Sequence, residues 1–445
     1  MINRRLTAAL AIGALPFAAG AQELDSELTA HLPEGQPVEG VLRVAAEYDD
    51  SQIRIHYKFE TDDPSWMHQM LRFEDGEWVR YGAGSGGPDA HGHYEDRISM
   101  LLDDGSVDHF DLYGGWMTSH EGIRTTASEV SSDAVEAHPH LGETLGRSDA
   151  RKFLPQSRDV EDDAETNWDA VRDTEELEQL QADGVFLDLW QWRAHRSHPM
   201  GVADNGYVLE YRLASSGSSM FTNNWDGDAE QPAWMFDEEQ TGLVALDWDA
   251  VVAGDYGQDD PYFISEDNAV PFDPDRDWQE GDTIPQRFLQ EPEGSRGAIA
   301  AEGGWEDGAW RITLTRTLEA PDPMDSKTLE DGGVYDVACA VHTGGVGARW
   351  HLVSIPETLG LGVEGATITA QHSDTRLSDD ELDWVELPLV YPGQVNWQWL
   401  HSQDHPGQDD ILEREEGLQD FHALDLDLED FRRFVLGHDR ALTED

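Results

Sequence analysis

The sequence contains 445 residues, of which 92 are acidic and only 29 are Lys or Arg, which gives a formal net charge of −63. Because so few basic residues are available to neutralise phosphates, this composition argues against nucleic-acid binding. Cys339 is the only cysteine, so an intrachain disulfide, a cysteine-rich zinc or iron–sulfur site and a c-type haem attached through C-x-x-C-H are all excluded.

The acidic excess is accompanied by a near absence of lysine, with only Lys58, Lys152 and Lys327 in the chain. This pattern is typical of an exported protein from a halophile, whose surface needs counter-ions to stay compact. Disorder is the competing explanation of a high net charge. However, 16 Trp, 14 Phe and 11 Tyr supply ample apolar surface for a folded core.

The first 21 residues have the features of a secretory signal peptide. Arg4 and Arg5 form a basic start, residues 6–17 are an apolar run, and the sequence AGA at residues 19–21 is a cleavage site. We expect cleavage near Ala21 and a periplasmic or secreted mature protein, with an N-terminal membrane anchor as the alternative. No later apolar run approaches the ~18 residues that span a bilayer, so we expect a mature chain that is not membrane-spanning.

Alternating apolar and polar residues predict β-strands along much of the chain. Residues 41–48 and 52–59 are separated by Asp-Asp-Ser and predict a hairpin. An Asp-Gly pair between Trp305 and Trp310 predicts a second tight turn. Cys339 lies in an apolar strand pattern and is expected to be a small buried residue. Further strands are predicted at residues 94–105, 206–214, 308–318 and 334–342.

Helical signals are fewer than strand signals. Residues 166–184 carry early acids and end at a glycine, and residues 428–437 predict a short terminal helix. Between residues 199 and 305, loops rich in Asp, Gly and Pro are expected to predominate. We therefore expect a mainly β fold, an antiparallel β-sandwich with long loop insertions and a few short helices. The expected divisions are a signal peptide over 1–21, a sandwich domain over 22–370 and an acidic C-terminal extension over 371–445.

Three segments combine aromatic side chains with groups that can bind metal. They offer what a haem requires, namely axial Met or His, apolar and aromatic walls, and arginine donors for the propionates. One of them contains WMTSH, which has the outline of C-x-x-C-H but holds Trp116 and Ser119 at the cysteine positions and keeps only His120. The segments are GGWMTSHEG (114–122), DLWQWRAHRSHP (188–199) and VACAVHTGGVGARWHLVSIP (337–356).

Each of these residues also has a purely structural explanation. The histidines can be core residues whose hydrogen bonds are satisfied. Trp190 and Trp192 share one face of a strand and can simply fill the core. Arg193 and Arg196 can pair with some of the many acids.

Acidic loops at 226–230, 257–262 and 272–278 offer oxygen ligands for calcium, although none has EF-hand spacing. Solvated surface is the alternative explanation. No H-E-x-x-H or G-x-S-x-G motif is present, and no single pair of carboxylates stands out for glycoside hydrolysis. The sequence thus contains no positive motif for catalysis.

The segment GVFLDLWQWRAHRSHPMGVADNGYV (184–208) resembles the W-x-W-x-x-x-R stretch of the ethylbenzene dehydrogenase-related haem-binding domain. Residues 95–105, 114–122 and 334–356 resemble further stretches of that family in the same order, and the resemblance covers residues 41–362. It implies a β-sandwich haem fold and electron transfer through a bound haem rather than catalysis by this chain. The best understood members are γ subunits of periplasmic molybdenum dehydrogenases, with one b-type haem held by Met and Lys, whereas others carry C-x-x-C-H and a c-type haem.

The resemblance also implies roles for particular residues. Because the cysteines are absent, a bound haem would be haem b. Where some γ subunits have their ligating Lys, this chain reads RWHLVS, which implies His351 as one axial ligand. The WMTSH loop implies the other ligand, His120, with Met117 as its first substitute. The remaining haem contacts, with the arginines facing the propionates, are Trp190, Trp192, Arg193, Arg196 and Arg349.

From these features we expect an exported haem b protein that passes electrons between a membrane quinol or cytochrome system and a soluble redox partner. The resemblance implies a membrane cytochrome b or molybdenum dehydrogenase subunits as partners. The alternative is a β-sandwich binding module without haem, in which exposed tryptophans would stack on a carbohydrate or another small ligand.

Overall fold

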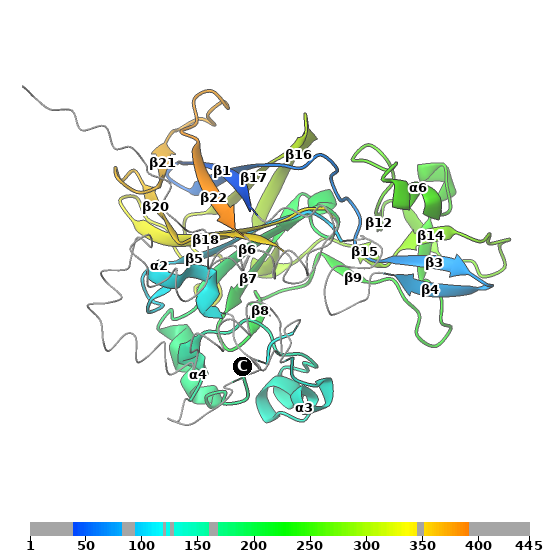
Figure 1. The fold of residues 1–445 in the computed structure, drawn as a ribbon, viewed down its shortest axis with the longest axis horizontal. Coiled ribbons are helices and arrows are strands. Elements are labelled where there is room, and N and C mark those ends of the chain that lie inside the picture. The colour runs from blue at the N-terminus through cyan, green and yellow to red at the C-terminus, as the bar shows by residue number, and fades with distance from the viewer. Residues whose placement is uncertain are drawn as a thin grey trace, which may run out of the picture.

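The computed structural model describes residues 39–81, 94–118, 122–124, 129–159, 168–344 and 351–390. They form a closed β-barrel, a smaller lobe beside it and short helices around it (Figure 1). The prediction of a mainly antiparallel β fold with long insertions and few short helices is confirmed. The strands expected in two layers are joined by hydrogen bonds into one closed sheet.

Eight strands follow one another around most of the barrel, each antiparallel to its neighbours. Alternate residues along each strand point into the barrel, which explains the period-2 pattern of the sequence. In order around the barrel, the strands are β1 (Glu39–Tyr48), β2 (Gln52–Glu60), β17 (Ala309–Thr317), β16 (Ile299–Glu306), β7 (Val202–Val208), β6 (Leu187–Arg193), β5 (Arg97–Asp103) and β18 (Val334–His342).

Two pairs of short strands, rather than one long strand, close the barrel between β18 and β1. At one end, β20 (Glu357–Leu361) pairs with β18 and β21 (Ile368–His372), and β21 pairs in parallel with β1. At the other end, β19 (Leu352–Ser354) pairs with β18 and β22 (Val385–Val390), and β22 pairs with β1. The barrel therefore extends to residue 390, past the division expected at residue 370.

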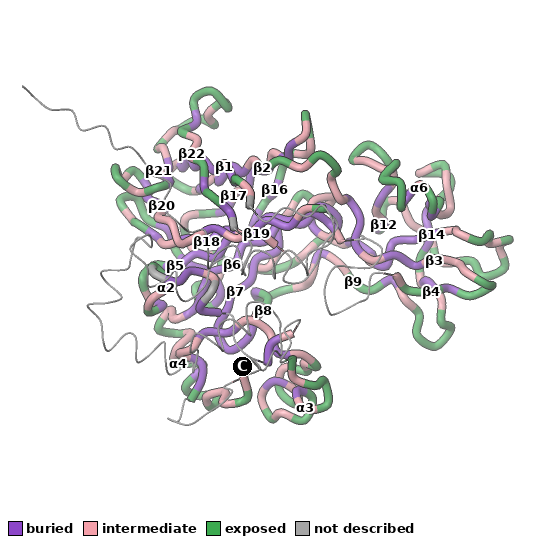
Figure 2. Tube along the Cα trace, in the orientation of Figure 1, coloured by how far each residue is buried: buried purple, intermediate pink, exposed green. Residues whose placement is uncertain are grey.

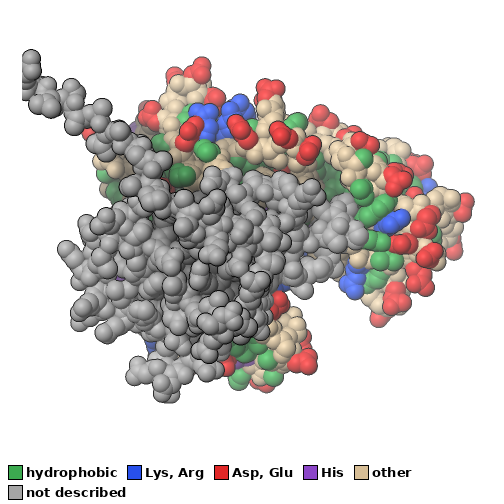
Figure 3. Space-filling view, viewed as in Figure 1, with side chains coloured by type: hydrophobic (Ala, Val, Ile, Leu, Met, Phe, Trp, Pro, Cys, Tyr) green, Lys and Arg blue, Asp and Glu red, His purple; other side chains and the backbone are tan. Residues whose placement is uncertain are grey.

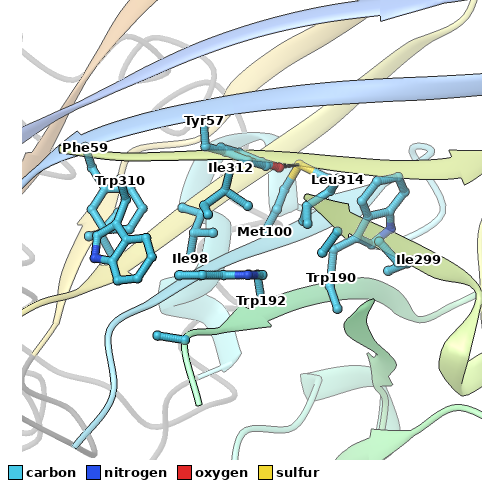
Figure 4. Close-up of a cluster of buried hydrophobic side chains, with 14 of the residues drawn as sticks. Tyr57, Phe59, Ile98, Met100, Trp190, Trp192, Ile299, Trp310, Ile312 and Leu314 are labelled. Carbon is cyan, nitrogen blue, oxygen red and sulfur yellow. Dashed lines mark hydrogen bonds between the residues drawn. The ribbon is translucent and has the colours of Figure 1, made fainter. Parts of the chain in front are cut away.

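Aromatic side chains fill the barrel interior. Trp190, Trp192 and Trp310 are fully buried, and the rings of Trp192 and Trp310 lie 4.8 Å apart. Tyr57 donates a hydrogen bond from its hydroxyl to the Met100 sulfur over 3.3 Å. Figure 4 shows these side chains pointing toward one another from different strands, and Figure 2 shows buried residues following the barrel strands. The interior is thus a packed core.

A buried ion pair lies near the ends of β6 and β17. Arg316 Nη1 is 2.6 Å from Asp188 Oδ2, and both side chains are completely buried. The Arg316 guanidinium also lies 4.4 Å from the centre of the Trp190 ring and donates a 2.7 Å hydrogen bond to the Lys327 carbonyl. The barrel core therefore includes one charged pair that contacts the aromatic packing directly.

Both predicted hairpins are present. β1 and β2 pair in an antiparallel hairpin with Tyr48 opposite Ile53, and β16 and β17 are joined at Asp307 and Gly308. These two residues have φ angles of 52° and 80°, which is the left-handed conformation that a tight hairpin turn requires and that Asp-Gly adopts readily. The buried position expected for Cys339, in β18, is also confirmed.

The lobe consists of three small sheets formed by β3, β4 and β9–β15. The segment 199–305, where loops were expected to predominate, also supplies the strands β7 to β16. Most of these strands have only two to four residues, too few for a periodic pattern. The lobe strands are β3 (Met70–Glu74), β4 (Glu77–Tyr81), β9 (Phe221–Asn223), β10 (Trp234–Phe236), β11 (Leu246–Asp247), β12 (Ile264–Ser265), β13 (Ala269–Pro271), β14 (Asp282–Pro285) and β15 (Arg287–Leu289).

The prediction of a single strand over 206–214 is wrong. The chain reverses after β7 and returns as β8 (Arg212–Ala214), which pairs with β7 through Tyr207 and Leu213. Leu209 and Tyr211 are buried within this reversal. The apolar residues that resemble one continuous strand therefore include residues of a turn.

The helices are short. The helix predicted over 166–184 is present as α4 (Thr174–Ala182), which begins after Asp173, whose side chain accepts a hydrogen bond from the Glu176 amide. None of the helices among the described residues has the length and apolarity needed to cross a membrane. The others are α2 (Phe110–Tyr113), α3 (Ser132–Glu136), α5 (Glu238–Thr241), α6 (Trp248–Ala253), the 3₁₀ segments η1 (Gly114–Thr118), η3 (Pro155–Ser157), η4 (His198–Met200) and η5 (Gly294–Gly297), and the π-helical η2 (Pro139–Thr144).

Acidic side chains are spread over the described surface visible in Figure 3, with only a few Lys and Arg among them. This distribution follows from the net charge of the chain. The predicted signal peptide, the terminal helix over 428–437 and most of the predicted acidic extension lie outside the described residues.

Candidate functional site

The outer face of β18, β5 and β6 carries three rows of side chains, each crossing the three strands in register. The first row is apolar, the second is small or polar, and the third is basic. The rows are Ala338, Leu101 and Leu189, then Ala340, Ser99 and Gln191, then His342, Arg97 and Arg193.

Helix α2 and segment η1 cover the apolar row. Met117, in η1, is 3% exposed and belongs to the same apolar cluster as Leu101 and Ala338. The approach is close at Gly114, where an added Cβ would lie 3.3 Å from that of Ala338 and where φ is +52°. Gly114 therefore lets η1 lie directly on the sheet and fixes Met117 against it.

Lys152 holds the same segment from the other side. Its Nζ lies 3.2 Å from Thr118 Oγ1 and 3.5 Å from the Gly115 carbonyl. Burial lowers the pKa of Lys152 to about 8, and the nearby Arg212 charge adds to this effect. Met117 and Thr118, the residues of WMTSH whose side chains the structure describes, are thus held by apolar packing on the barrel and by a polar contact with Lys152.

His351 lies at the opposite end of this face. It directly precedes β19, and its ring stacks on His342 with 4.5 Å between centroids and 17° between planes. His342 is four residues beyond Ala338 along β18, which corresponds to about 13 Å along a strand. Met117 and His351 therefore lie toward opposite ends of one face, with the small Ala340 and Ser99 between those ends.

Five guanidinium groups gather at the basic row, two of them from the row itself, and we call them the arginine cluster: Arg97, Arg193, Arg196, Arg212 and Arg287. Arg97 and Arg193 are only 6% and 4% exposed. Gln191 joins members of the cluster, because its Oε1 accepts hydrogen bonds from Arg193 Nε over 2.8 Å and Arg212 Nη2 over 2.6 Å.

Two carboxylates face the arginine cluster. Glu95 is fully buried, pairs with Arg196 and accepts 2.7 Å hydrogen bonds from the amides of His195 and Arg196. Burial alone would raise the pKa of Glu95, but Arg196 and Arg97 outweigh it and lower the pKa to about 2. Asp204 lies 2.8 Å from Arg193 Nη1 and also pairs with Arg296 at 2.9 Å, so it serves two cations.

The basic environment changes the titration of the cluster and of its neighbour Tyr94. Burial lowers the pKa of Arg97 and Arg287 to about 10 and that of Arg212 to about 9. Burial raises the pKa of Tyr94, but the charges of Arg97 and Arg196 outweigh it and hold the pKa at about 8. The Arg97 guanidinium lies 3.8 Å from the centre of the Tyr94 ring.

A second buried carboxyl, Asp96, lies on the barrel side of the same segment. Its Oδ2 accepts hydrogen bonds from Trp310 Nε1 over 2.8 Å and from the Ser65 amide over 3.0 Å. Burial is the main cause that raises the pKa of Asp96 to about 7. Because the folded state binds this proton more tightly than the unfolded state, the contribution of Asp96 to stability is greatest below about pH 4 and is lost as the pH rises through about 7.

Replacement of Asp96 by asparagine is expected to increase the free energy of unfolding above pH 7, by at most about 4 kcal/mol. Asparagine keeps an oxygen acceptor for the two donors and removes the buried charge. Chemical denaturation between pH 4 and 9 measures this effect, with the exposed Asp62→Asn as the matched control. A variant whose stability followed the pH exactly as the control does would show that Asp96 is not responsible.

A family model described as ethylbenzene dehydrogenase matches residues 23–354. The chain belongs to the ethylbenzene dehydrogenase family. The resemblance identified from the sequence is thereby confirmed, although no curated protein matches the chain. The part that matches the ethylbenzene dehydrogenase family contains Met117, the arginine cluster and His351, and it ends at Ser354, the last residue of β19.

The residues predicted to contact haem in this member of the ethylbenzene dehydrogenase family fall into three groups. Met117, Arg193, Arg196 and His351 lie on or beside the outer face described above. Trp190 and Trp192 lie inside the barrel, so the sheet separates them from Met117 and Arg193. His120 and Arg349 lie outside the described residues.

Sequence reasoning missed Arg97, Arg212 and Arg287 as members of the cluster. Arg97 and Arg193 are more than 90 positions apart, and only the pairing of β5 with β6 makes them neighbours. One signal was present, because Arg97 begins a strand that is otherwise almost entirely apolar.

In two of the acidic loops, a carboxylate accepts hydrogen bonds from backbone amides of the same loop. Asp226 accepts hydrogen bonds from the amides of Asp228 and Ala229, and Asp273 accepts one from the Asp275 amide. Within the described part of the chain, no three His, Cys, Asp or Glu side chains converge in a way that could hold a metal ion.

Proposed function

We propose that this member of the ethylbenzene dehydrogenase family is an exported haem b protein that passes electrons between a membrane quinol or cytochrome system and a soluble redox partner. The observation that carries the proposal is the outer face of β18, β5 and β6, where Met117 and His351 lie toward opposite ends beside the arginine cluster, of which Arg97 and Arg193 are buried. The family match supports the proposal, because it contains every one of these residues.

The donor groups on this face fit a non-covalent haem. A thioether and an imidazole are the axial ligands of many electron-transfer haems. Guanidinium groups bind carboxylates through paired, charge-assisted hydrogen bonds, so the arginine cluster suits the propionates. Leu101, Leu189 and Ala338 supply an apolar surface next to Met117, and Ala340 and Ser99 leave the centre of the face without bulky side chains.

In this proposal, Met117 and His351 hold the iron, with His120 as the other candidate from the WMTSH loop. A bound haem supplies a one-electron carrier. The chain's own residues fix its position, since Gly114 and Lys152 hold η1 against the barrel and the stack with His342 orients His351. A haem held by both Met117 and His351 would carry electrons rather than bind a substrate, which favours electron transfer over catalysis by this chain.

Purified protein expressed with haem supplied tests the proposal. We expect a Soret band, b-type bands on reduction and a six-coordinate, low-spin spectrum. His351→Ala and Met117→Leu are each expected to shift the spectrum toward high spin. The matched controls are His372→Ala and Met324→Leu, because both of these side chains are exposed and neither belongs to the three rows of the face.

Two outcomes would count against this assignment. A folded but colourless protein would contradict haem binding altogether. An unchanged spectrum in His351→Ala, with haem still bound, would move that ligand to another residue, and His120→Ala would then be the next variant to measure.

A further inference from the structure

The arginine cluster contains more positive charge than its surroundings neutralise. Five guanidinium groups face Glu95 and Asp204, and Asp204 is shared with a sixth arginine, Arg296. In the described part of the chain, Arg212 and Arg287 form no ion pair and donate to the side-chain oxygens of Gln191 and Gln69. Buried charges without partners are strongly unfavourable, so a cluster of this kind calls for an anion.

Arg97 has an open edge. Its Nε and Nη2 atoms are buried and make no hydrogen bond to any of the described residues, among which its one ion pair, from Nε to Glu95 Oε1, is 3.8 Å long. These two nitrogens form one side of the guanidinium fork, which matches the two oxygens of a carboxylate. The tyrosine ring beneath Arg97 leaves this edge unpaired.

The cluster joins the barrel to the lobe. Arg97 and Arg193 belong to barrel strands, whereas Arg287 and Phe221 belong to the lobe strands β15 and β9. The Phe221 ring lies 5.9, 5.4 and 5.7 Å from the guanidinium carbons of Arg193, Arg196 and Arg287. An anion bound here would therefore relieve repulsion across the contact between the two parts.

We propose that the arginine cluster is a receptor for a pair of carboxylates, that Arg97 binds one of them through its open edge, and that this binding fastens the lobe to the barrel. The five arginines of the cluster carry about three more positive charges than Glu95 and Asp204 can neutralise. This excess favours the binding of two carboxylates over the binding of one. One source of the two carboxylates is the pair of propionates of a haem, and for this source the inference rests on the proposed function. A free dicarboxylate has the same chemistry and is the other source.

Thermal unfolding of the full-length protein, with ligands that contain no iron, tests whether the arginine cluster binds carboxylates. Succinate is expected to raise the midpoint more than sodium chloride or inorganic phosphate at equal ionic strength. Protoporphyrin IX is expected to bind about tenfold to a hundredfold more tightly than its dimethyl ester, which lacks the two charges. Limited proteolysis should show that succinate protects the connections between lobe and barrel.

Arg97→Met is the decisive variant. It should lose the response to succinate and the preference for the free acid of protoporphyrin, yet without ligand it should be at least as stable as the parent, because a buried charge whose only ion pair among the described residues is long has been removed. The matched control is Arg72→Met. Arg72 lies in the lobe and pairs with Glu74 and Glu280. This control should keep the full response to both ligands.

A spectroscopic titration gives a second readout. Tyr94 faces Arg97, Arg196, Glu95 and the edge of His68, and its hydroxyl should ionise near pH 8 in the free protein. Bound succinate or the Arg97→Met change should raise that pKa. An unmoved Tyr94 titration in both cases would contradict the placement of the carboxylate at Arg97.

The outcomes separate this inference from the proposed function. Equal binding of protoporphyrin and its ester, with no specific effect of succinate, overturns the receptor and leaves haem binding intact. Protection by succinate that depends on Arg97, in a protein that binds no haem, overturns the proposed function and identifies a free dicarboxylate as the ligand. Equal protection by phosphate overturns the specificity for paired carboxylates.

Discussion

Replacement of Trp310 by alanine is expected to lower the free energy of unfolding by about 3–5 kcal/mol. The ring is fully buried and lies 4.5 Å from Trp66 and 4.8 Å from Trp192. Strands that are hydrogen-bonded around the whole barrel cannot move inward to fill the cavity. The change also removes the 2.8 Å hydrogen bond from Trp310 Nε1 to Asp96, which leaves a buried carboxyl with one partner fewer.

Chemical denaturation followed by circular dichroism measures this loss. The matched control is Trp234→Ala in the lobe, where the side chain is 36% exposed and a change of about 1 kcal/mol or less is expected. If Trp310→Ala does not fold, Trp310→Phe keeps most of the ring and should still lose more stability than the control. Equal losses for the barrel and lobe variants would contradict a core that depends on this aromatic packing.

Removal of the Arg316 charge is expected to have an effect of similar size. Arg316→Met leaves Asp188 buried without its cation, and breaking such a pair costs about 3–5 kcal/mol. Burial raises the pKa of Asp188 even with Arg316 in place. Without Arg316, uptake of a proton becomes easier, so the variant should lose less stability at acidic pH than at neutral pH.

A double-mutant cycle isolates this pair. Asp188→Asn combined with Arg316→Met removes both charges and should be more stable than Arg316→Met alone. Arg276→Met is the surface control, since Arg276 pairs with Glu238 at 3.0 Å while their side chains are 35% and 62% exposed. This control should change stability by about 1 kcal/mol or less. A double variant as unstable as the single one would show that packing, not charge, dominates at this position.

The barrel could be predicted largely from the sequence because its strands are long enough to show their alternation. β1, β2, β17 and β18 each have nine or ten residues with one face in the core. The lobe could not be predicted in this way, since strands such as β11 and β12 have two residues each. Such short strands form because neighbouring strands pair with them, and the local sequence pattern does not indicate that pairing.

The candidate site was predictable in part. The WMTSH segment and His351 could be selected by the chemistry of their side chains and by the family resemblance. The alternation within β6 also separates Trp190 and Trp192 from Arg193, since even and odd positions of a strand point to opposite faces. The arginine cluster could not be predicted, because its members are brought together by strand register and by contact between the lobe and the barrel.

The way in which the barrel closes has a consequence for how the chain folds. Ala46 of β1 pairs with Ala370, and Val44 pairs with Val385, so closure joins residues more than three hundred positions apart. Contacts at such separation slow folding, because a long loop must be ordered before they form. Until β19 to β22 have been synthesised, β1 and β18 remain open strand edges that can pair with another chain. The four shortest barrel strands thus determine when the nascent protein stops being prone to aggregation.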